Sequence, residues 1–440
     1  MSFAGVTILV IFSFMALGAP LLTPYTPQGS IVSGQLDPPI WYSQLAGGNG
    51  WSQNAEFSGL TVVGGTGVQV NIIDQTSNSV NFTVNMPQAL GGSVTVMKTI
   101  SYPYNGPPQS FTGKVDVVPH GLQGTNGAKG TVYIQRGTST WMLWQKIFVA
   151  GDYSPPTDLT YPLDFGASQF TPAQVIFSEK SDFVYALKMD LPAGVSQANF
   201  DVAPFRMLLW GNTWGLLGTD SGGGDLYTQF IYGSRISLTV GLLATFIGIS
   251  VGLTIGLLAG YLGKVVDEVL MRFTDMMLVI PGLPLLIVLV SVLGPSLFTI
   301  IGVLGFLGWM GFARVIRSQV LSLRERPFIE AAKASGAGTG YITTKHIFPN
   351  IVGLTYVNLA LSVPAAIVGE AALSFLGLGA TGVVSWGQML ELAHGAASSA
   401  GLLWWWVIPP GIGIALLSLS FILIGYALDE MFNPRLRRRR

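Results

Sequence analysis

The sequence predicts an α-helical membrane protein that crosses the bilayer several times and carries an inserted all-β domain. Three observations lead to this fold class. Hydrophobic residues make up 50% of the 440 residues, charged residues make up 10%, and the mean hydropathy is +0.53, as expected for a chain with much of its surface in lipid. Several apolar runs are long enough to cross about 30 Å of hydrocarbon. A long polar segment after the first run contains short stretches of β-forming residues.

Six apolar runs are candidate membrane helices. The first begins almost at Met1 with no basic residue before it, so we expect a retained helix rather than a cleaved signal peptide, although Ala16-Leu17-Gly18 would suit a cleavage site. Only Gly294-Pro295-Ser296 separates the short third and fourth runs, which predicts a tight helical hairpin. The six runs are Phe3 to Leu22, Ile236 to Ala259, Met276 to Leu293, Leu297 to Ala313, Ile351 to Leu376 and Leu402 to Leu428.

The polar segment after the first helix (residues 1–23) is far too long for a loop. We expect residues 24–205 to form a β-rich domain and residues 206–235 to connect it to the second membrane helix. Trp141 and Trp144 are more typical of core packing than of a stacking platform. Gly, Asn, Pro and Ser clusters separate the β-type runs, which predicts a β-sandwich. These runs include Leu60 to Val63, Val68 to Ile73, Val80 to Val84, Ser93 to Met97, Gly130 to Ile134 and Trp141 to Val149.

The basic residues predict the orientation, because short cytoplasmic loops are rich in Lys and Arg. The loops at 294–296 and 377–401 contain no Lys or Arg. We therefore expect residues 24–235 outside the cell, a helical core at 236–434, and a cytoplasmic loop at 314–350 and tail at 435–440. The thirteen basic residues assigned to the cytoplasm are Lys264, Arg272, Arg314, Arg317, Arg324, Arg326, Lys333, Lys345, Arg435, Arg437, Arg438, Arg439 and Arg440.

The loop at 314–350 has an ordered pattern of its own. Pro327 to Ser335 predicts a short helix in which Glu330 and the alanines after it, Ala331 and Ala332, form a small flat face with one charge. Gly336 can end that helix in the left-handed conformation that glycine adopts readily.

A second short helix follows the glycine. We expect Thr339 to cap this helix, which continues through Lys345, and Pro349 to stop it before the fifth membrane run. The loop would then be a compact knob of two helices and a glycine corner.

This loop resembles the Glu-Ala-Ala coupling loop of ATP-binding-cassette importer permeases. Its ending, His346-Ile347-Phe348-Pro349-Asn350, is most similar to the dipeptide and oligopeptide branch. The resemblance implies the six-helix fold of a type I importer permease. It also implies that the loop docks into a cleft on a separate ATPase subunit. The residues to which it gives this coupling role are Glu330, Ala331, Ala332, Gly336, His346 and Pro349.

The resemblance runs from Gly215 onward and covers about half of the chain. Gly218-Thr219-Asp220 and Asp225 match the stretch before the second membrane helix, with Gly224 in place of the family's arginine. The stretch from Glu370 to Gly379 and Ser385-Trp386-Gly387 also match. The large outside domain does not match the family's usual short connection, so the resemblance leaves that domain unexplained.

The family's assembly implies several partners. They are a second, nonidentical permease that forms a heterodimer, two ATPase subunits, and an extracellular solute-binding protein. ATP and Mg would bind to the ATPase subunits, since the chain contains no G-x-x-x-x-G-K-[ST] phosphate loop. The net charge of zero gives no sign of a nucleic-acid partner. The absence of cysteine excludes thiolate sites, and three scattered histidines form no spaced metal motif, so we expect no catalytic, cofactor or metal site in this chain.

Glu370 is the charged residue of the apolar runs, and such a group is costly in lipid unless it faces water, a partner or the bundle interior. It could line the translocation path, or it could be solvated at the outer end of the fifth helix. Four glycines of the fourth run, Gly302, Gly305, Gly308 and Gly311, predict close helix packing.

Three classes of function remain open at this point. The first is the permease of an importer for peptides, or alternatively for oligosaccharides. The second is a secondary transporter or channel, although such proteins usually carry more charges within their spans. The third is a membrane-anchored, glycan-active enzyme with an acidic pair in the outside domain. The candidate acids for that enzyme are Asp152, Asp158, Asp164, Glu179 and Asp182.

Overall fold

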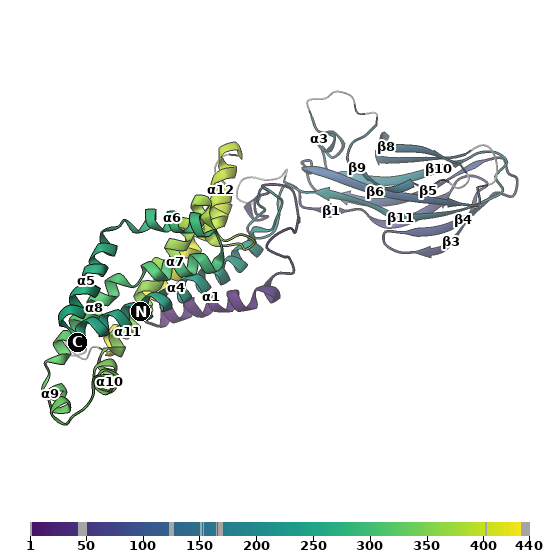
Figure 1. The fold of residues 1–440 in the computed structure, drawn as a ribbon. Helices are drawn as coiled ribbons and strands as arrows, with labels where there is room; N and C mark the ends of the chain where they lie inside the picture. Colours follow the sequence, from purple (N-terminus) through teal and green to yellow (C-terminus); the bar gives the residue numbers. More distant parts are fainter. Residues whose placement is uncertain are drawn as a thin grey trace. The chain divides into compact units, whose positions relative to one another are not determined.

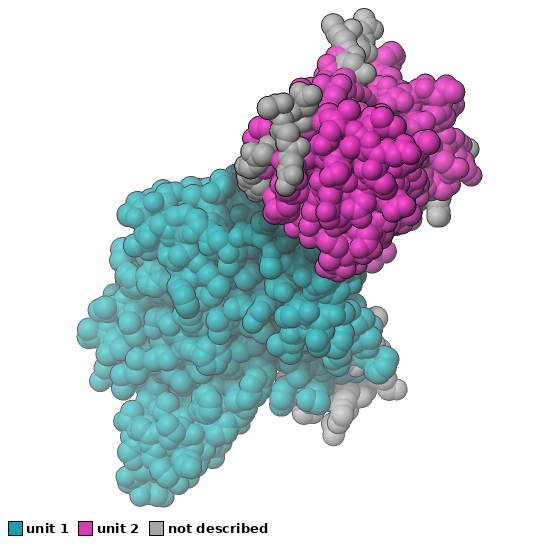
Figure 2. Space-filling model, turned by 90° about the vertical axis from the view of Figure 1, so that its right-hand side faces the viewer, with its two compact units in different colours: residues 1–30, 224–440 teal, residues 31–223 magenta. Residues whose placement is uncertain are grey.

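The computed structural model describes residues 2–42, 51–122, 127–149, 152, 154–163, 165, 170–400 and 403–432. The chain forms two compact units, shown in different colours in Figure 2. Residues 1–30 and 224–440 make a helical unit, and residues 31–223 make a β unit. The basic tail at 435–440 and the start of the sixth run at Leu402 lie outside the described residues.

The helical unit contains α1 and the whole C-terminal half of the chain (Figure 1). Among the described residues, five helices or joined helices are long and apolar enough to span a membrane, or six if the bent pair α5 and α6 counts as one span. Its elements are α1 (Ser2–Leu22), α4 (Leu226–Leu262), α5 (Lys264–Val279), α6 (Gly282–Leu293), α7 (Leu297–Leu307), α8 (Met310–Arg324), α9 (Pro327–Ala334), α10 (Thr339–Ile342), the π-helical turn η1 (Thr343–Ile347), α11 (Phe348–Leu373), the π-helical turn η2 (Ser374–Leu378), α12 (Trp386–Ala400) and α13 (Trp404–Phe432).

The third predicted span is wrong as a single helix. Met276 to Val279 belongs to α5, and α6 begins only at Gly282, after a bend of 89°. Ile280 has an extended backbone at φ −71° and ψ 127°, because Pro281 disfavours the helical conformation in the residue before it. The predicted hairpin after α6 is present, since Gly294 has φ 88° and Ser296 caps α7.

Helix α4 lies against α7, α8 and α11 along a stripe of glycines. A Cβ atom on Gly252 would lie 2.7 Å from the carbonyl oxygen of Trp309, and one on Gly256 would lie 2.6 Å from the Cβ of Ile316. The helices therefore approach more closely than any side chain at these positions would allow. Of the four glycines that the sequence singled out in the fourth run, Gly305 makes such a contact, and Gly302 has open space around it.

The β unit is a sandwich of two antiparallel sheets. One has the strand order β3-β4-β11-β6-β9, with β1 also paired to β11, and the other has the order β2-β5-β10-β7-β8. The strands are β1 (Ala55–Glu56), β2 (Ser58–Gly64), β3 (Gln69–Gln75), β4 (Val80–Asn85), β5 (Gly92–Tyr102), β6 (Ser110–His120), β7 (Ala128–Arg136), β8 (Ser139–Phe148), β9 (Ser154–Leu159), β10 (Ser181–Leu191) and β11 (Gln197–Trp210), with a short helix α3 (Pro172–Ile176).

Alternating residues of both sheets fill the core of the sandwich. Phe82 and Phe200 from the first sheet and Val132 and Leu187 from the second are fully buried in one cluster. Trp144 is partly buried and packs against the same cluster, as expected for a core residue. The unit extends to Gly223, and β11 continues through Trp210. The β unit therefore includes most of the segment expected to be a connector, and the rest of that segment forms the start of α4.

Candidate functional site

Helix α9, the turn after it and α10 form the segment between α8 and α11, at the opposite end of the helical unit from α6 and α12 (Figure 1). Pro327 starts α9 at a position where the missing N–H costs nothing, after Arg326 in an extended conformation. The predicted helix therefore forms, one residue shorter than expected.

Gly336 ends α9 in the left-handed conformation, with φ 81°. Its N–H donates to the carbonyl of Lys333 at 3.0 Å, and the N–H of Ala337 donates to the carbonyl of Ala332 at 3.0 Å. These two bonds form a Schellman motif, which satisfies the last carbonyls of a helix. The turn is thus a defined corner between two helices.

Isoleucines attach this corner to the membrane helices. Ile329 of α9, Ile342 of α10 and Ile347 of η1 are at most 1% exposed. They share one cluster with Ile316 of α8 and Ile249 of α4. These buried isoleucines therefore pack α9 and α10 tightly against α4 and α8.

The outer side of the segment carries an open hollow between α9 and α10. Three of its side chains are aromatic: the ring of His346 lies 6.3 Å from that of Phe328 and 5.7 Å from that of Tyr341. Phe328 is 44% exposed and Tyr341 57% exposed. The hollow is lined by Phe328, Ala331, Ala332, Ser335, Gly336, Ala337, Gly338, Tyr341 and His346.

The structure brings together five of the six residues to which the resemblance gave a coupling role. Ala331, Ala332, Gly336 and His346 line the hollow, and Glu330 is exposed on α9 beside Ala331. Sequence reasoning missed Phe328 and Tyr341. A signal for Phe328 was present, since it shares a helix face with Ala331, Ala332 and Ser335 at the spacing i, i+3, i+4 and i+7.

The sixth residue, Pro349, does not stop a helix, and this prediction is wrong. Helical turns run without a break from Thr339 through η1 to Leu373 at the end of α11, with Pro349 in the first turn of α11. The turn before it is π-helical, with the N–H of Phe348 bonded to the carbonyl of Thr343. This wider turn makes room for the proline ring, which would clash with a carbonyl in a regular α-helix. The expected cap is also different, because Gly338 rather than Thr339 is the N-cap of α10.

Ion pairs connect α5 to α8 near this segment. The guanidinium of Arg317 binds the carboxylate of Asp267 through two nitrogen atoms, with Nη2 2.6 Å from Oδ2. Arg314 pairs with Asp275, which lies about two turns further along α5. A two-pronged Arg–carboxylate pair fixes orientation as well as distance, so α5 and α8 are held in a defined register.

Glu370 lies apart from this segment, on α11. Its side chain is buried at 2% exposure and accepts a 2.7 Å hydrogen bond from Ser374 Oγ to Oε1. The interpretation of Glu370 as a solvated group at the outer end of the helix is therefore wrong within this chain, because the side chain is buried with Ser374 and Ser385 beside its carboxyl.

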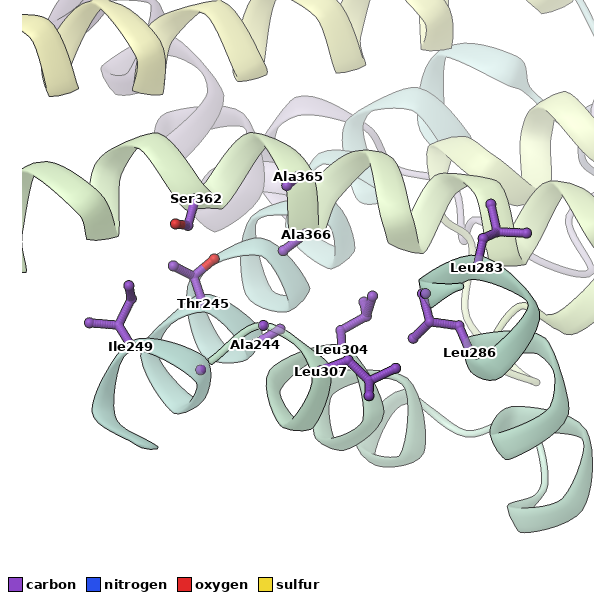
Figure 3. Close-up of a pocket in the computed structure, with 13 residues that line it drawn as sticks. Ala244, Thr245, Ile249, Leu283, Leu286, Leu304, Leu307, Ser362, Ala365 and Ala366 are labelled. Atoms are coloured by element: carbon purple, nitrogen blue, oxygen red, sulfur yellow. The ribbon is translucent and has the colours of Figure 1, made fainter. Parts of the chain in front are cut away.

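A second cavity lies inside the helical unit, between α4, α6, α7 and α11 (Figure 3). It has a volume of about 320 Å³ and is open to solvent. Leucines, including Leu283, Leu286 and Leu304, line it together with glycines and alanines, and Thr245 and Ser362 contribute hydroxyls. Glu370 does not line this cavity.

Two of the acidic residues considered for an enzyme are held in ion pairs with basic side chains. Asp158 lies 3.2 Å from Lys114 and Glu179 lies 3.6 Å from Arg136, in exposed ion pairs. Asp164 lies outside the described residues. Within the described part of the chain, no three His, Asp or Glu side chains are grouped so as to hold a metal ion.

Comparisons with known proteins match this chain to membrane components of transport systems. Residues 252–438 match the family model described as "Binding-protein-dependent transport system inner membrane component". The chain is 39% identical over 222 residues to the dipeptide transport system permease protein DppC of Bacillus subtilis (strain 168), which covers 50% of this chain and 69% of that protein. It is 38% identical over 219 residues to the oligopeptide transport system permease protein OppC of Haemophilus influenzae, at 50% and 70% coverage.

A solved structure is also similar. The inward-facing MetNI methionine ABC transporter matches with a TM-score of 0.36 and 18% sequence identity, over 48% of this chain and 97% of that chain. The range of the family match includes α9, α10 and Glu370, and the β unit lies outside it.

Proposed function

The chain belongs to the family of binding-protein-dependent transport system inner membrane components, and we propose that it is a permease subunit of an ATP-driven peptide importer. Relatives named as dipeptide and oligopeptide permeases, 39% and 38% identical to this chain, support peptides as the cargo.

The observation that carries the proposal is the segment of α9 and α10. Its Schellman corner fixes the angle between the two helices, its isoleucines attach it to α4 and α8, and its outer hollow exposes Phe328 and Tyr341. A contiguous exposed aromatic surface on a rigid support is typical of a protein-binding site. We assign this surface to docking of a separate ATPase subunit.

The attachment of α9 and α10 to α4 and α8 would couple the ATPase subunits to the membrane helices. ATP binding and hydrolysis change the relative positions of the ATPase subunits, and a partner can shift the permease only through a surface that it holds differently in the two states. The buried isoleucines would transfer that displacement to α4 and α8. Helix α4 borders the leucine-lined cavity, and α8 follows α7, which also borders it. ATP and Mg bind on the ATPase subunits, because this sequence has no phosphate loop.

The assembly that we propose contains a second permease, two ATPase subunits and a solute-binding protein. The cavity between α4, α6, α7 and α11 would form one half of the translocation pathway, with the bent pair α5 and α6 as the sixth span. Segment 314–350 and the basic tail would face the cytoplasm, and the β unit the exterior, as the distribution of Lys and Arg indicates. Glu370, enclosed by helices, would position η2 beside the pathway.

Uptake by the reconstituted importer tests this function. The chain is placed in proteoliposomes with its second permease, its ATPase subunits and its solute-binding protein, and ATP-dependent uptake of labelled trialanine is compared with that of cellobiose and maltose. We expect uptake of trialanine that requires ATP. Uptake of the disaccharides alone would change the cargo to oligosaccharides, and failure of the ATPase subunits to bind the chain would contradict the permease assignment.

A further inference from the structure

A polar pocket lies at one end of the first sheet of the β unit, where β6 ends and β11 begins. It has a volume of about 370 Å³ and is open to solvent. Five polar side chains line it: Thr83, His120, Ser196, Gln197 and Asn199. The other lining residues are glycines and an alanine.

The strand register explains why these side chains meet. Asn199 of β11 lies opposite Thr83 of β4 on one side and opposite His120 of β6 on the other. Side chains opposite each other on adjacent antiparallel strands have Cβ atoms about 4.5–5.5 Å apart. Gln197 lies two residues before Asn199 and therefore projects from the same face. That face points away from the core, because the alternate residues of β11, Ala198 and Phe200, are buried in the sandwich.

The described side chains of the pocket can form hydrogen bonds, and none of them is permanently charged. Among the described residues, its lining contains hydroxyls, amides, an imidazole and backbone groups, with no Lys, Arg, Asp or Glu and no large apolar side chain. The Oδ1 atom of Asn199 is buried and has no hydrogen-bond partner among the described residues. A buried acceptor without a partner is uncommon in proteins, so the Asn199 amide has hydrogen-bonding capacity that the neighbouring strands do not use.

The polar side chains of the pocket favour some classes of ligand over others. An anion would need cationic partners, and a short free peptide would need partners for both of its charged termini, which the pocket lacks. A neutral sugar fits, because each of its hydroxyls both donates and accepts a hydrogen bond, and an amide side chain offers one acceptor and two donors. We propose that the pocket formed by Thr83, His120, Ser196, Gln197 and Asn199 binds a neutral saccharide. This site does not depend on the cargo of the importer.

Binding by the whole chain tests the proposal. The purified chain in nanodiscs, without glycosidic detergents because their sugar headgroups would compete, is titrated with cellotetraose, maltotetraose and mannotetraose. Trialanine and trigalacturonate serve as the peptide and anionic comparators. Saturation-transfer NMR and calorimetry report binding, and we expect at least one neutral tetrasaccharide to bind and neither comparator to do so.

Two variants and a matched control locate the site. Asn199→Ala and Gln197→Ala should weaken saccharide binding at least tenfold. Gln145→Ala should leave it within twofold, because Gln145 is exposed on β8 in the other sheet. Circular dichroism and thermal unfolding check that each variant folds.

Three outcomes would overturn the proposal. They are no binding of any neutral tetrasaccharide at millimolar concentration, equal loss in the Gln145 variant, and trialanine binding that Asn199→Ala abolishes. The last would make the pocket a peptide site. None of these outcomes bears on ATPase docking, which the uptake experiment tests separately.

Discussion

The backbone N–H of Ala337 donates a hydrogen bond of 3.0 Å to the carbonyl of Ala332, and this bond closes the turn between α9 and α10. The turn requires Gly336 at φ 81°, a conformation in which a side chain is strained. The angle at which α9 meets α10 therefore depends on a single residue. In the proposed complex, that angle decides how Phe328 and Tyr341 face the ATPase subunit.

Gly336→Ala should weaken ATPase binding without unfolding the membrane unit. No atom lies within 4 Å of the position that its Cβ would occupy, so the effect is conformational alone. The left-handed conformation costs a residue with a Cβ about 1–2 kcal/mol, which predicts about a 5- to 30-fold loss of affinity. Recovery of the ATPase subunits by the immobilised permease measures this loss.

The matched control is Gly338→Ala. Gly338 has φ −74° and also has open space around it, so alanine fits there without strain. Gly336→Asn should retain more binding than Gly336→Ala, because asparagine tolerates the left-handed conformation. Equal ATPase recovery with Gly336→Ala and Gly338→Ala would remove the turn from the docking mechanism.

Phe328→Ala and Tyr341→Ala should each reduce ATPase binding and leave stability nearly unchanged. Both rings are largely exposed within this chain, at 44% and 57%, and exposed substitutions usually change stability by less than about 0.5 kcal/mol. Aromatic anchors at protein interfaces commonly contribute about 2 kcal/mol or more. Phe348→Ala is the control, since Phe348 begins α11 close to the segment, is 38% exposed and does not line the hollow. A loss as large in the control would assign the effect to the segment as a whole.

The sequence predicted the parts of this site that depend on neighbouring residues. Pro327 at the start of α9 and Gly336 at its end act through local backbone geometry, so their roles could be read from their spacing. The placement of Phe328 and Tyr341 in one hollow depends on how Ile329 and Ile342 pack against α8. That packing brings together residues on separate helices, and no local pattern indicates it.

Prolines account for two of the errors. Pro281 bends the chain by 89° between α5 and α6, where a continuous span was expected. Pro349 was expected to stop a helix and instead lies inside a long one, because the π-helical turn η1 precedes it. The same residue type thus ends one helix and continues another. The difference depends on hydrogen bonding in the preceding turn, which the sequence alone does not determine.

The central strands of the β unit were also difficult to predict. Strand β11 pairs with β4 and β6 in the middle of the first sheet, yet it contains Asn199, Asp201 and Pro204, which are uncommon in strands. The alternation of Ala198, Phe200 and Val202 toward the core was the available signal. Its polar residues occupy the outer face, where they form part of the proposed saccharide site.

Gly256→Ala should destabilise the helical unit, and Gly302→Ala should not. The new methyl group on Gly256 would lie 2.6 Å from the Cβ of Ile316 and 2.7 Å from the carbonyl of Ala313. Overpacking of this kind costs about 1–3 kcal/mol. Gly302 has no atom within 4 Å of its Cβ position, so alanine there should be neutral or stabilise the helix by about 0.5–1 kcal/mol. Thermal unfolding in detergent compares the two, and a lower Tm for Gly302→Ala would contradict this packing.

The pH dependence of stability of the β unit should contain a contribution from Asp37. This carboxyl is 3% exposed and accepts a 2.7 Å hydrogen bond from Ser33 Oγ. Burial raises its pKa from 3.8 to about 6, an effect that the hydrogen bonds from Ser33 and Gly34 only partly offset. The folded state therefore binds the proton more tightly than the unfolded state. As pH rises from about 4 to about 6, ionisation of Asp37 progressively lowers the free energy of unfolding. The decrease is complete at pH 7.

Asp37→Asn isolates this contribution, because asparagine keeps the shape and the acceptor for Ser33 and cannot ionise. A shift of about two pKa units corresponds to about 3 kcal/mol, so the variant should be more stable than the natural chain at pH 7 and nearly equal to it at pH 4. Thermal unfolding of both proteins at pH 4, 5, 6 and 7, followed by the β-sheet signal in circular dichroism, gives the difference at each pH. A constant difference would mean that Asp37 has an ordinary pKa, and a variant less stable at pH 7 would mean that the charged carboxylate has a stabilising partner in the folded state.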